Sequence, residues 1–204
     1  MSVTNTTLIR GAGLVASPWK NGGGLTREVA AFPEGAALDA FVWRVSVADV
    51  AQAGPFSRFA GIDRTLALLS GAGMLLDEAG GVTHALRAPL DIARFPGETA
   101  VDARLVDGAT RDFNLMVRRG AATGDVDVWR DVHRAQLDAD VALLFCAHGE
   151  LHVTTGDSAS ESTTTLETND TLRIDDARAL ACEIKGTGAL VAVAIRYTEP
   201  SQAR

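Results

Sequence analysis

An internal repeat constrains the fold more than any other feature of this sequence. Three apolar landmarks in the first half recur in the second half at nearly one offset, the one that separates Gly71 from Gly149. Unrelated β-rich segments share apolar alternation but not a common offset, so the pattern indicates a duplicated structural unit. The matched segments are residues 66–71 with 144–149, residues 114–118 with 192–196 and, after one extra residue, residues 90–95 with 169–174.

We expect the two halves to be residues 1–120 and 125–204, meeting near residues 119–128. Helix periodicity is scarce, and short apolar or alternating runs between turn residues predict a β-sandwich or barrel. The Ser/Thr-rich stretch at residues 154–165 is expected to be a flexible hairpin loop. The expected strands are residues 41–50, 64–76, 82–88, 111–117, 141–153, 166–174 and 189–197.

Composition excludes several classes of protein. A net charge of −7 leaves no basic surplus for phosphates, so nucleic acid is not an expected partner. No apolar run approaches the roughly 18–20 residues of a membrane span, and the first residues do not form a secretory signal, so we expect a cytoplasmic protein without a membrane partner. Cys146 and Cys182 are the only cysteines and are expected to be buried thiols.

Three motifs of the N-terminal half occur in a specific order. They are WKNGGGLTRE at residues 19–28, WRVSVA at residues 43–48 and GPFSRFAGIDR at residues 54–64. Together they resemble the signature of the HutD family, also called Ves. The resemblance is specific from about Trp19 to Arg118 and fades to a general β pattern in the second half.

The resemblance implies a fold and a function. It implies an all-β bicupin, with two tandem cupin-like (jelly-roll) β-barrel halves, in agreement with the repeat. It also implies binding of a small carboxylated metabolite of histidine degradation, such as urocanate or formylglutamate. No catalytic activity is firmly attached to the family.

The metal-binding pattern of cupins is missing from both halves. The pattern is His-x-His, three or four residues, Glu, six residues, Gly, and anchoring it on Gly71 places Arg64 at the Glu position and Ser57 and Phe59 at the His positions. None of these is a ligand for a divalent metal, so we expect no metal and no cofactor. Anchoring the second half on Gly149 gives Ala142, Leu137 and Ala135.

One other group of residues has metal-ligand chemistry. His148, Glu150 and His152 share one face of an expected strand, because alternate residues of a strand point the same way. They lie beyond the glycine relative to the usual cupin site. An exposed polar strand face explains them without a metal, and we prefer that interpretation.

Arg64 at the lost metal position suggests an anion site instead. A guanidinium presents a fixed fork of donors that suits a carboxylate. Arg44 and Ser46 share one face of their strand and could add a second cation and a hydroxyl. Arg44 could equally form a structural salt bridge with one of the 26 acidic residues.

Further candidates come from a loop and from the last strand of the first half. Lys20, Asn21 and Gly22 open a glycine-rich segment that could approach a ligand closely or could be a plain turn. Asn114 points away from its neighbours Phe113 and Leu115, either towards a buried backbone group or into a cavity. Trp19 and Phe56 could form an apolar wall or belong to the core. The predicted ligand-binding residues are Lys20, Asn21, Gly22, Arg44, Ser46, Phe56, Ser57, Arg64 and Asn114.

These features favour a metal-free protein that binds a small carboxylated metabolite, and the resemblance to the HutD family implies that it modulates histidine utilisation. One alternative is a metal-free cupin enzyme, an isomerase or a hydrolase, with Glu28 or Asp63 as the acid or base. A carboxylate beside arginines normally has a lowered pKa, which disfavours this role, so no catalytic residue is predicted. Another alternative is an interaction module with a vestigial, apolar cavity. Edge strands could also pair two copies of the chain in a homodimer.

Overall fold

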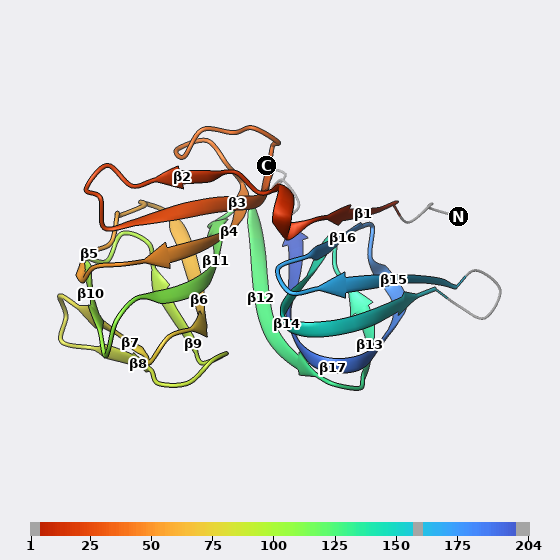
Figure 1. The fold of residues 1–204 in the computed structure, drawn as a ribbon. Coiled ribbons are helices and arrows are strands. Elements are labelled where there is room, and N and C mark those ends of the chain that lie inside the picture. The colour runs from red at the N-terminus through yellow and green to blue at the C-terminus, as the bar shows by residue number, and fades with distance from the viewer. Residues whose placement is uncertain (1–4, 157–160, 199–204) are drawn as a thin grey trace, which may run out of the picture. The chain divides into compact units, whose positions relative to one another are not determined.

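The computed structural model describes residues 5–156 and 161–198 and is built almost wholly of β-strands (Figure 1). It divides into two compact units. The N-terminal unit comprises residues 14–122, and the C-terminal unit combines the described residues up to Gly13 with those from Thr123 onward. Within the described ranges, no helix is long and apolar enough to cross a membrane.

The N-terminal unit contains two antiparallel sheets. The strands of the larger sheet are, in spatial order, β2 (Ala16–Pro18), β3 (Gly24–Phe32), β4 (Trp43–Val50), β11 (Thr110–Arg118), β6 (Ile62–Ser70) and β9 (Ile92–Pro96). Those of the smaller sheet are β5 (Gly54–Pro55), β10 (Val101–Leu105), β7 (Met74–Glu78) and β8 (Thr83–Leu86).

The C-terminal unit has one extended sheet that contains two long strands. Its path is β1 (Asn5–Ile9), β16 (Thr171–Asp175), β14 (Val141–Thr155), β17 (Arg178–Tyr197) and β12 (Ala122–Arg130). Off this path, β13 (His133–Asp138) pairs with β17, and β15 (Ser162–Glu167) pairs with β14.

The strand order supports the duplication predicted from the sequence. In the N-terminal unit β4, β11, β6 and β9 are neighbours in that order, and β12, β17, β14 and β16 repeat it in the C-terminal unit. The registers also agree: Met116 lies opposite Arg64, and Ala194 lies opposite Ala142, which is the same pair moved by the offset of the repeat. The two units are therefore copies of one architecture.

Backbone conformation marks the same repeat. Leu90 and Asn169, paired by the sequence alignment, both adopt a left-handed conformation, with φ of 73° and 76°. This region is uncommon for residues other than glycine, so its recurrence at matched positions is a further sign of common architecture.

Two predicted strands are interrupted. The prediction for residues 64–76 covers β6 and β7, because Gly71 and Gly73 adopt φ of 109° and 132° and turn the chain between them. The prediction for residues 166–174 covers the end of β15 and most of β16. Because the apolar residues continue through the turn, the hydrophobic periodicity of the sequence does not reveal where one strand ends and the next begins.

The described part of the predicted hairpin loop at residues 154–165 is mostly strand. Strand β14 extends to Thr155, β15 begins at Ser162, and Thr154 pairs with Thr163. Threonine has a β-branched side chain that favours the strand conformation. This preference has a larger effect here than the polar composition from which a loop was predicted. Residues 157–160 of the predicted loop lie outside the described residues.

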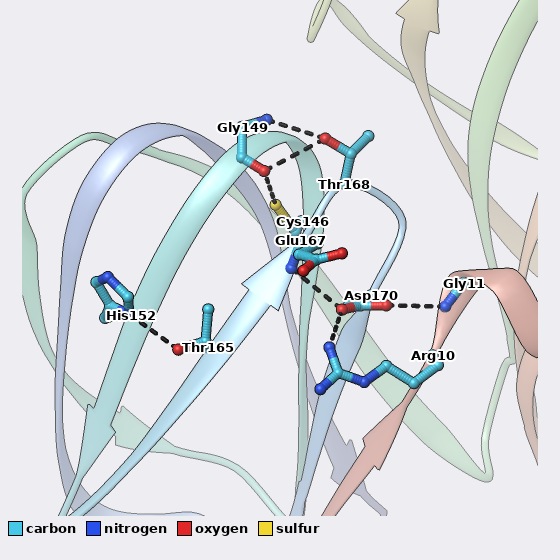
Figure 2. Close-up of polar contacts among 9 residues, drawn as sticks. All are labelled: Arg10, Gly11, Cys146, Gly149, His152, Thr165, Glu167, Thr168 and Asp170. Atoms are coloured by element: carbon cyan, nitrogen blue, oxygen red, sulfur yellow. Dashed lines mark hydrogen bonds and ion pairs between the residues drawn. The ribbon is translucent and has the colours of Figure 1, made fainter.

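The first strand joins the C-terminal unit, although the sequence analysis placed it in residues 1–120. Strand β1 pairs with β16 through all five of its residues. Asp170 holds the segment that follows, accepting hydrogen bonds from the Gly11 amide at 2.9 Å and from Arg10 Nη1 at 2.6 Å (Figure 2). A third donor, the Glu167 amide, lies 3.1 Å from the same carboxylate.

The cysteines are free and buried, as predicted. Cys146 and Cys182 belong to the apolar core of the C-terminal unit. Burial raises the pKa of the Cys146 thiol to about 11 and that of Cys182 to about 12, so both are uncharged packing groups at neutral pH.

Candidate functional site

Three adjacent strands line a cavity of about 590 Å³ in the N-terminal unit. Alternate side chains of β4, β11 and β6 point to its interior. One row across the sheet contains Arg44, Met116 and Arg64, and the next contains Ser46, Asn114 and Leu66. A third row contains Ala48, Asp112 and Leu68. The cavity therefore has charged and polar groups on its floor.

Arg64 is almost fully buried, with 6% of its surface exposed. Its guanidinium carbon lies 5.3 Å, 5.7 Å and 5.0 Å from the ring centroids of Phe56, Phe59 and Phe95, within the range of cation–π contacts. These rings fix the position of the side chain. Arg64 is thus held in place mainly by aromatic rings.

The hydrogen-bonding capacity of Arg64 is mostly unused. Nη1 donates to the Ser57 carbonyl at 3.3 Å, and Nε has no acceptor among the described residues. No carboxylate within the described ranges forms an ion pair with Arg64. Burial lowers the pKa of Arg64 to about 10, and Asp112 partly opposes the shift. The group remains charged at neutral pH and available to an anion.

Arg44 fulfils both roles that the sequence left open. It lines the cavity, and its Nε donates to Glu28 Oε2 at 2.7 Å. Its Nη1 also donates to Ser46 Oγ at 3.3 Å. Because Glu28 already balances its charge, Arg44 is a weaker candidate than Arg64 for the principal anion contact.

Asp112 is the functional candidate that the sequence analysis missed. Its side chain lines the cavity, 1% of its surface is exposed, and its Oδ2 has no hydrogen-bond donor among the described residues. Burial raises the pKa of Asp112 to about 7, although Arg64 opposes this. Asp112 stands two residues before Asn114, so the strand alternation that placed Asn114 could also have identified it.

Asn114 lines the cavity, which resolves its two interpretations in favour of the second. It is 9% exposed, and its Oδ1 has no partner within the described part of the chain. Phe113 and Leu115, which alternate with it, are buried on the other face of the strand. An amide can rotate to offer either a donor or an acceptor to a ligand.

The glycine-rich segment forms a turn at the rim. Lys20 and Asn21 line the cavity, whereas Gly22 does not. Gly22 has φ of 69° and its amide donates to the Trp19 carbonyl at 3.0 Å, so its conformation belongs to the turn. A Cβ on Gly24 would lie 2.4 Å from the Asp49 carbonyl oxygen, which explains that glycine by strand packing.

An aromatic wall closes one side of the cavity. Trp19 and Phe56 both line it and meet edge to face, with ring centroids 6.4 Å apart. Trp19 Nε1 donates to Thr26 Oγ1 at 2.7 Å, which satisfies the indole and fixes its orientation. These contacts give the cavity the apolar surface that small-molecule sites usually have.

The structure brings together eight of the nine predicted ligand-binding residues, all except Gly22. The two carboxylates considered as acid or base lie elsewhere. Asp63 is 63% exposed and pairs with Arg119 at 2.6 Å, and Glu28 pairs with Arg44. Neither lines the cavity, so Asp112 replaces them as the candidate for proton transfer.

Few side chains in the described residues are placed where they could bind a metal ion. Within them, no group of three or more His, Cys, Asp or Glu side chains is arranged to hold a metal. His152 Nδ1 lies 3.0 Å from Thr165 Oγ1 (Figure 2) and its Nε2 lies 3.9 Å from Glu150 Oε1. His148, Glu150 and His152 occupy the stretch of β14 that pairs with β15 or β17.

The C-terminal unit shows that the fold does not require these polar groups. The offset of the repeat carries Arg64, Asp112 and Asn114 onto Ala142, Leu190 and Ala192, and all three lie in the apolar core of that unit. The apolar interior that we expected of an interaction module is therefore a property of the C-terminal unit, not of the N-terminal one.

Comparison with known proteins agrees with this architecture. The sequence model of the HutD family matches residues 12–192. The chain belongs to the HutD family. An uncharacterized 21.2 kDa protein in the hutC 3′ region of Pseudomonas putida is 35% identical over 185 residues, which cover 90% of this chain and 95% of that protein. Protein Ves of Citrobacter koseri is 38% identical over 111 residues, covering 54% and 56% of the two chains.

Solved structures confirm the predicted fold. HutD from Pseudomonas fluorescens SBW25, in a formate condition, superimposes with a TM-score of 0.81 at 31% identity and covers 95% of this chain and 100% of that one. An oxalate decarboxylase from Lactobacillus farciminis, a formate complex, gives a TM-score of 0.65 at 9% identity, covering 98% and 88% of the two chains. The latter likeness concerns the fold alone, and the chain is an all-β bicupin.

Proposed function

We propose that the cavity of the N-terminal unit binds a small carboxylated metabolite. The observation that carries the proposal is the buried Arg64, which is charged, held by three aromatic rings and paired with no carboxylate among the described residues. A buried cation without a partner is costly, and an anionic ligand would remove that cost. The planar fork of a guanidinium matches a carboxylate.

The family supports a metabolite of histidine breakdown as the ligand. The relative from Pseudomonas putida is named for its place in the hutC 3′ region. Urocanate and formylglutamate are carboxylates small enough for a cavity of about 590 Å³. In this proposal the protein modulates histidine utilisation in response to the level of such a metabolite.

Calorimetry and thermal unfolding with urocanate, formylglutamate, histidine and formate test this function. A ligand at 100 times its Kd adds about 2.7 kcal/mol to the free energy of unfolding, which is readily measured. We expect stabilisation by at least one of the carboxylates. If none of the four stabilises the protein or releases heat on binding, carboxylate sensing by this cavity is wrong.

Substitution of Arg64 then locates the binding site. Arg64→Met keeps much of the packing against the rings and removes the charge, so affinity should fall by about 2–5 kcal/mol. Arg64→Lys keeps the charge but not the fork and should also bind weakly. Arg104→Met is the matched control, because Arg104 is an exposed arginine that pairs with Asp77. Equal affinity in all the proteins would place the site elsewhere.

Asp112 favours a second candidate, a metal-free enzyme acting on a related carboxylate. A carboxyl group with a pKa of about 7 can both give and take a proton near neutral pH. Arg64 would hold the substrate in the same cavity. Incubation of the protein with urocanate or formylglutamate should then yield a product, and Asp112→Asn should abolish its formation. Product formation that survives this substitution would exclude Asp112 as the proton carrier.

A further inference from the structure

The cavity contains hydrogen-bond acceptors, which we call its acceptor end, in addition to the cationic Arg64. Asp112 and Asn114 are two residues apart on β11 and both line the cavity. Oδ2 of Asp112 and Oδ1 of Asn114 are buried and have no hydrogen-bond partner within the described residues. Two neighbouring side chains therefore retain hydrogen-bonding capacity that the surrounding protein does not use.

Asp112 is set apart from Arg64 along the sheet, and Asn114 lies on the row between them. Arg64 lies opposite Met116, and Asp112 is four residues from Met116 along β11, a separation of about 13 Å between the two rows of the sheet. No ion pair joins Arg64 to Asp112 among the described ion pairs, although both are buried and oppositely charged when ionised.

The energetic cost of burying unpaired polar atoms argues against a purely structural role for Asp112 and Asn114. A buried polar atom without a partner destabilises the folded state. The duplicated unit fills the same two positions with Leu190 and Ala192, both in its apolar core. The architecture is therefore compatible with apolar residues at these positions, and the polar ones point to a bound molecule.

Resting on the proposed carboxylate binding, we propose that the ligand carries an N–H group at the end opposite its carboxylate, and that Asp112 accepts a hydrogen bond from it. The ligand class is then a carboxylate joined to an amide, amine or azole nitrogen. Burial raises the pKa of Asp112 because its ionised form lacks donors. An N–H from the ligand supplies that donor, and Asn114 can rotate its amide to bind an adjacent atom.

A pair of probes separates the N–H from the carboxylate. Urocanate and 3-(3-furyl)acrylate share a planar acrylate arm and a five-membered ring, but only urocanate has a ring N–H. At pH 8 we expect the protein to bind urocanate about tenfold to hundredfold more tightly, since a hydrogen bond to a charged group has this effect on affinity. Equal affinities for the two probes would overturn the proposal and leave carboxylate binding intact.

Substitution of Asp112 by the residue of the duplicated unit completes the test. Asp112→Leu should remove the preference for urocanate while both probes still bind in an Arg64-dependent manner. A preference that persists in this variant would show that another group recognises the nitrogen and would also overturn the proposal. Absence of binding of either probe to the unsubstituted protein would instead exclude urocanate as the ligand, and the proposed function itself would be contradicted if formylglutamate, histidine and formate also failed to bind.

Discussion

Burial drives the two charged residues of the cavity towards their neutral forms, but with different consequences. It lowers the pKa of Arg64 to about 10 and raises that of Asp112 to about 7. At pH 7 Arg64 is therefore still a cation, whereas Asp112 is close to half protonated. The floor of the cavity has a net positive charge near neutral pH, and an anion is the ligand that this charge favours.

The raised pKa of Asp112 predicts a pH-dependent stability. Its folded-state pKa of about 7 exceeds the ordinary value of 3.8, so between these pH values the folded chain holds a proton that the unfolded chain releases. The free energy of unfolding therefore falls as pH rises from about 4 to about 7, by on the order of 4 kcal/mol from this residue. Asp112→Asn should remove this part of the decline.

Urea unfolding of the ligand-free proteins at pH 5 and pH 8 measures the effect. The stability of the Asp112→Asn variant relative to the unsubstituted protein should increase between the two values. Asp125→Asn is the control, because the Asp125 side chain is 72% exposed. If the two stability curves run parallel, Asp112 does not titrate in this range.

Most of the cavity could be predicted at the level of single residues, and Asp112 shows why the prediction was incomplete. Arg64 was found because it replaces a metal ligand in a known pattern, and Asn114 because an amide is unusual within a strand. Asp112, two residues before Asn114 on the same expected strand, was not singled out. Its burial depends on the neighbouring strands β4 and β6, which the local sequence does not reveal.

At the level of strands, those with long apolar runs were predictable, whereas others, including the interior strands β3 and β10, were not predicted. Strands β4, β11 and β14 contain long apolar runs and were expected at nearly their observed bounds. Strands β2 and β5 contain three and two residues and have no periodicity to detect. Strand β1 has an ordinary pattern, but its pairing with β16 depends on contacts with residues near the other end of the sequence.

Asp170 should determine whether β1 remains attached to β16. It is 4% exposed and accepts hydrogen bonds from two amides and from Arg10, so Asp170→Ala should cost on the order of 3 kcal/mol. Burial alone would raise the pKa of Asp170, but these donors outweigh it and lower the value. The stabilisation is therefore present above the unfolded pKa and is lost as pH falls through the lower folded one.

Amide hydrogen exchange and urea unfolding test the role of Asp170. In Asp170→Ala the amides of β1 should exchange faster than in the unsubstituted protein. Asp125→Ala removes an exposed partner of Arg196 and should change the free energy of unfolding by less than about 1 kcal/mol. Unchanged protection of β1 in Asp170→Ala would mean that strand pairing alone holds the segment.

At the level of the whole chain, one architecture occurs twice with two different interiors. The N-terminal copy encloses a cavity with Arg64, Asp112 and Asn114, and the C-terminal copy places alanine and leucine at the matched positions. The repeat in the sequence predicted the duplication and the residues that correspond in the two halves. The register of the strands agrees with that correspondence, and the structure adds that the matched positions lie in a cavity in one copy and in the apolar core in the other.

This difference between the copies predicts where a ligand acts. Saturation with a carboxylate that binds should slow amide exchange in β4, β6 and β11, because a ligand that binds only the folded state suppresses opening of the strands that contact it. Local opening of β14 and β17, whose inward-facing side chains form an apolar core, should be unaffected. The measurement is amide exchange followed by mass spectrometry with and without ligand, using Arg64→Met as the non-binding control. Protection confined to β14 and β17 would place the binding site in the C-terminal copy and contradict the assignment made from Arg64.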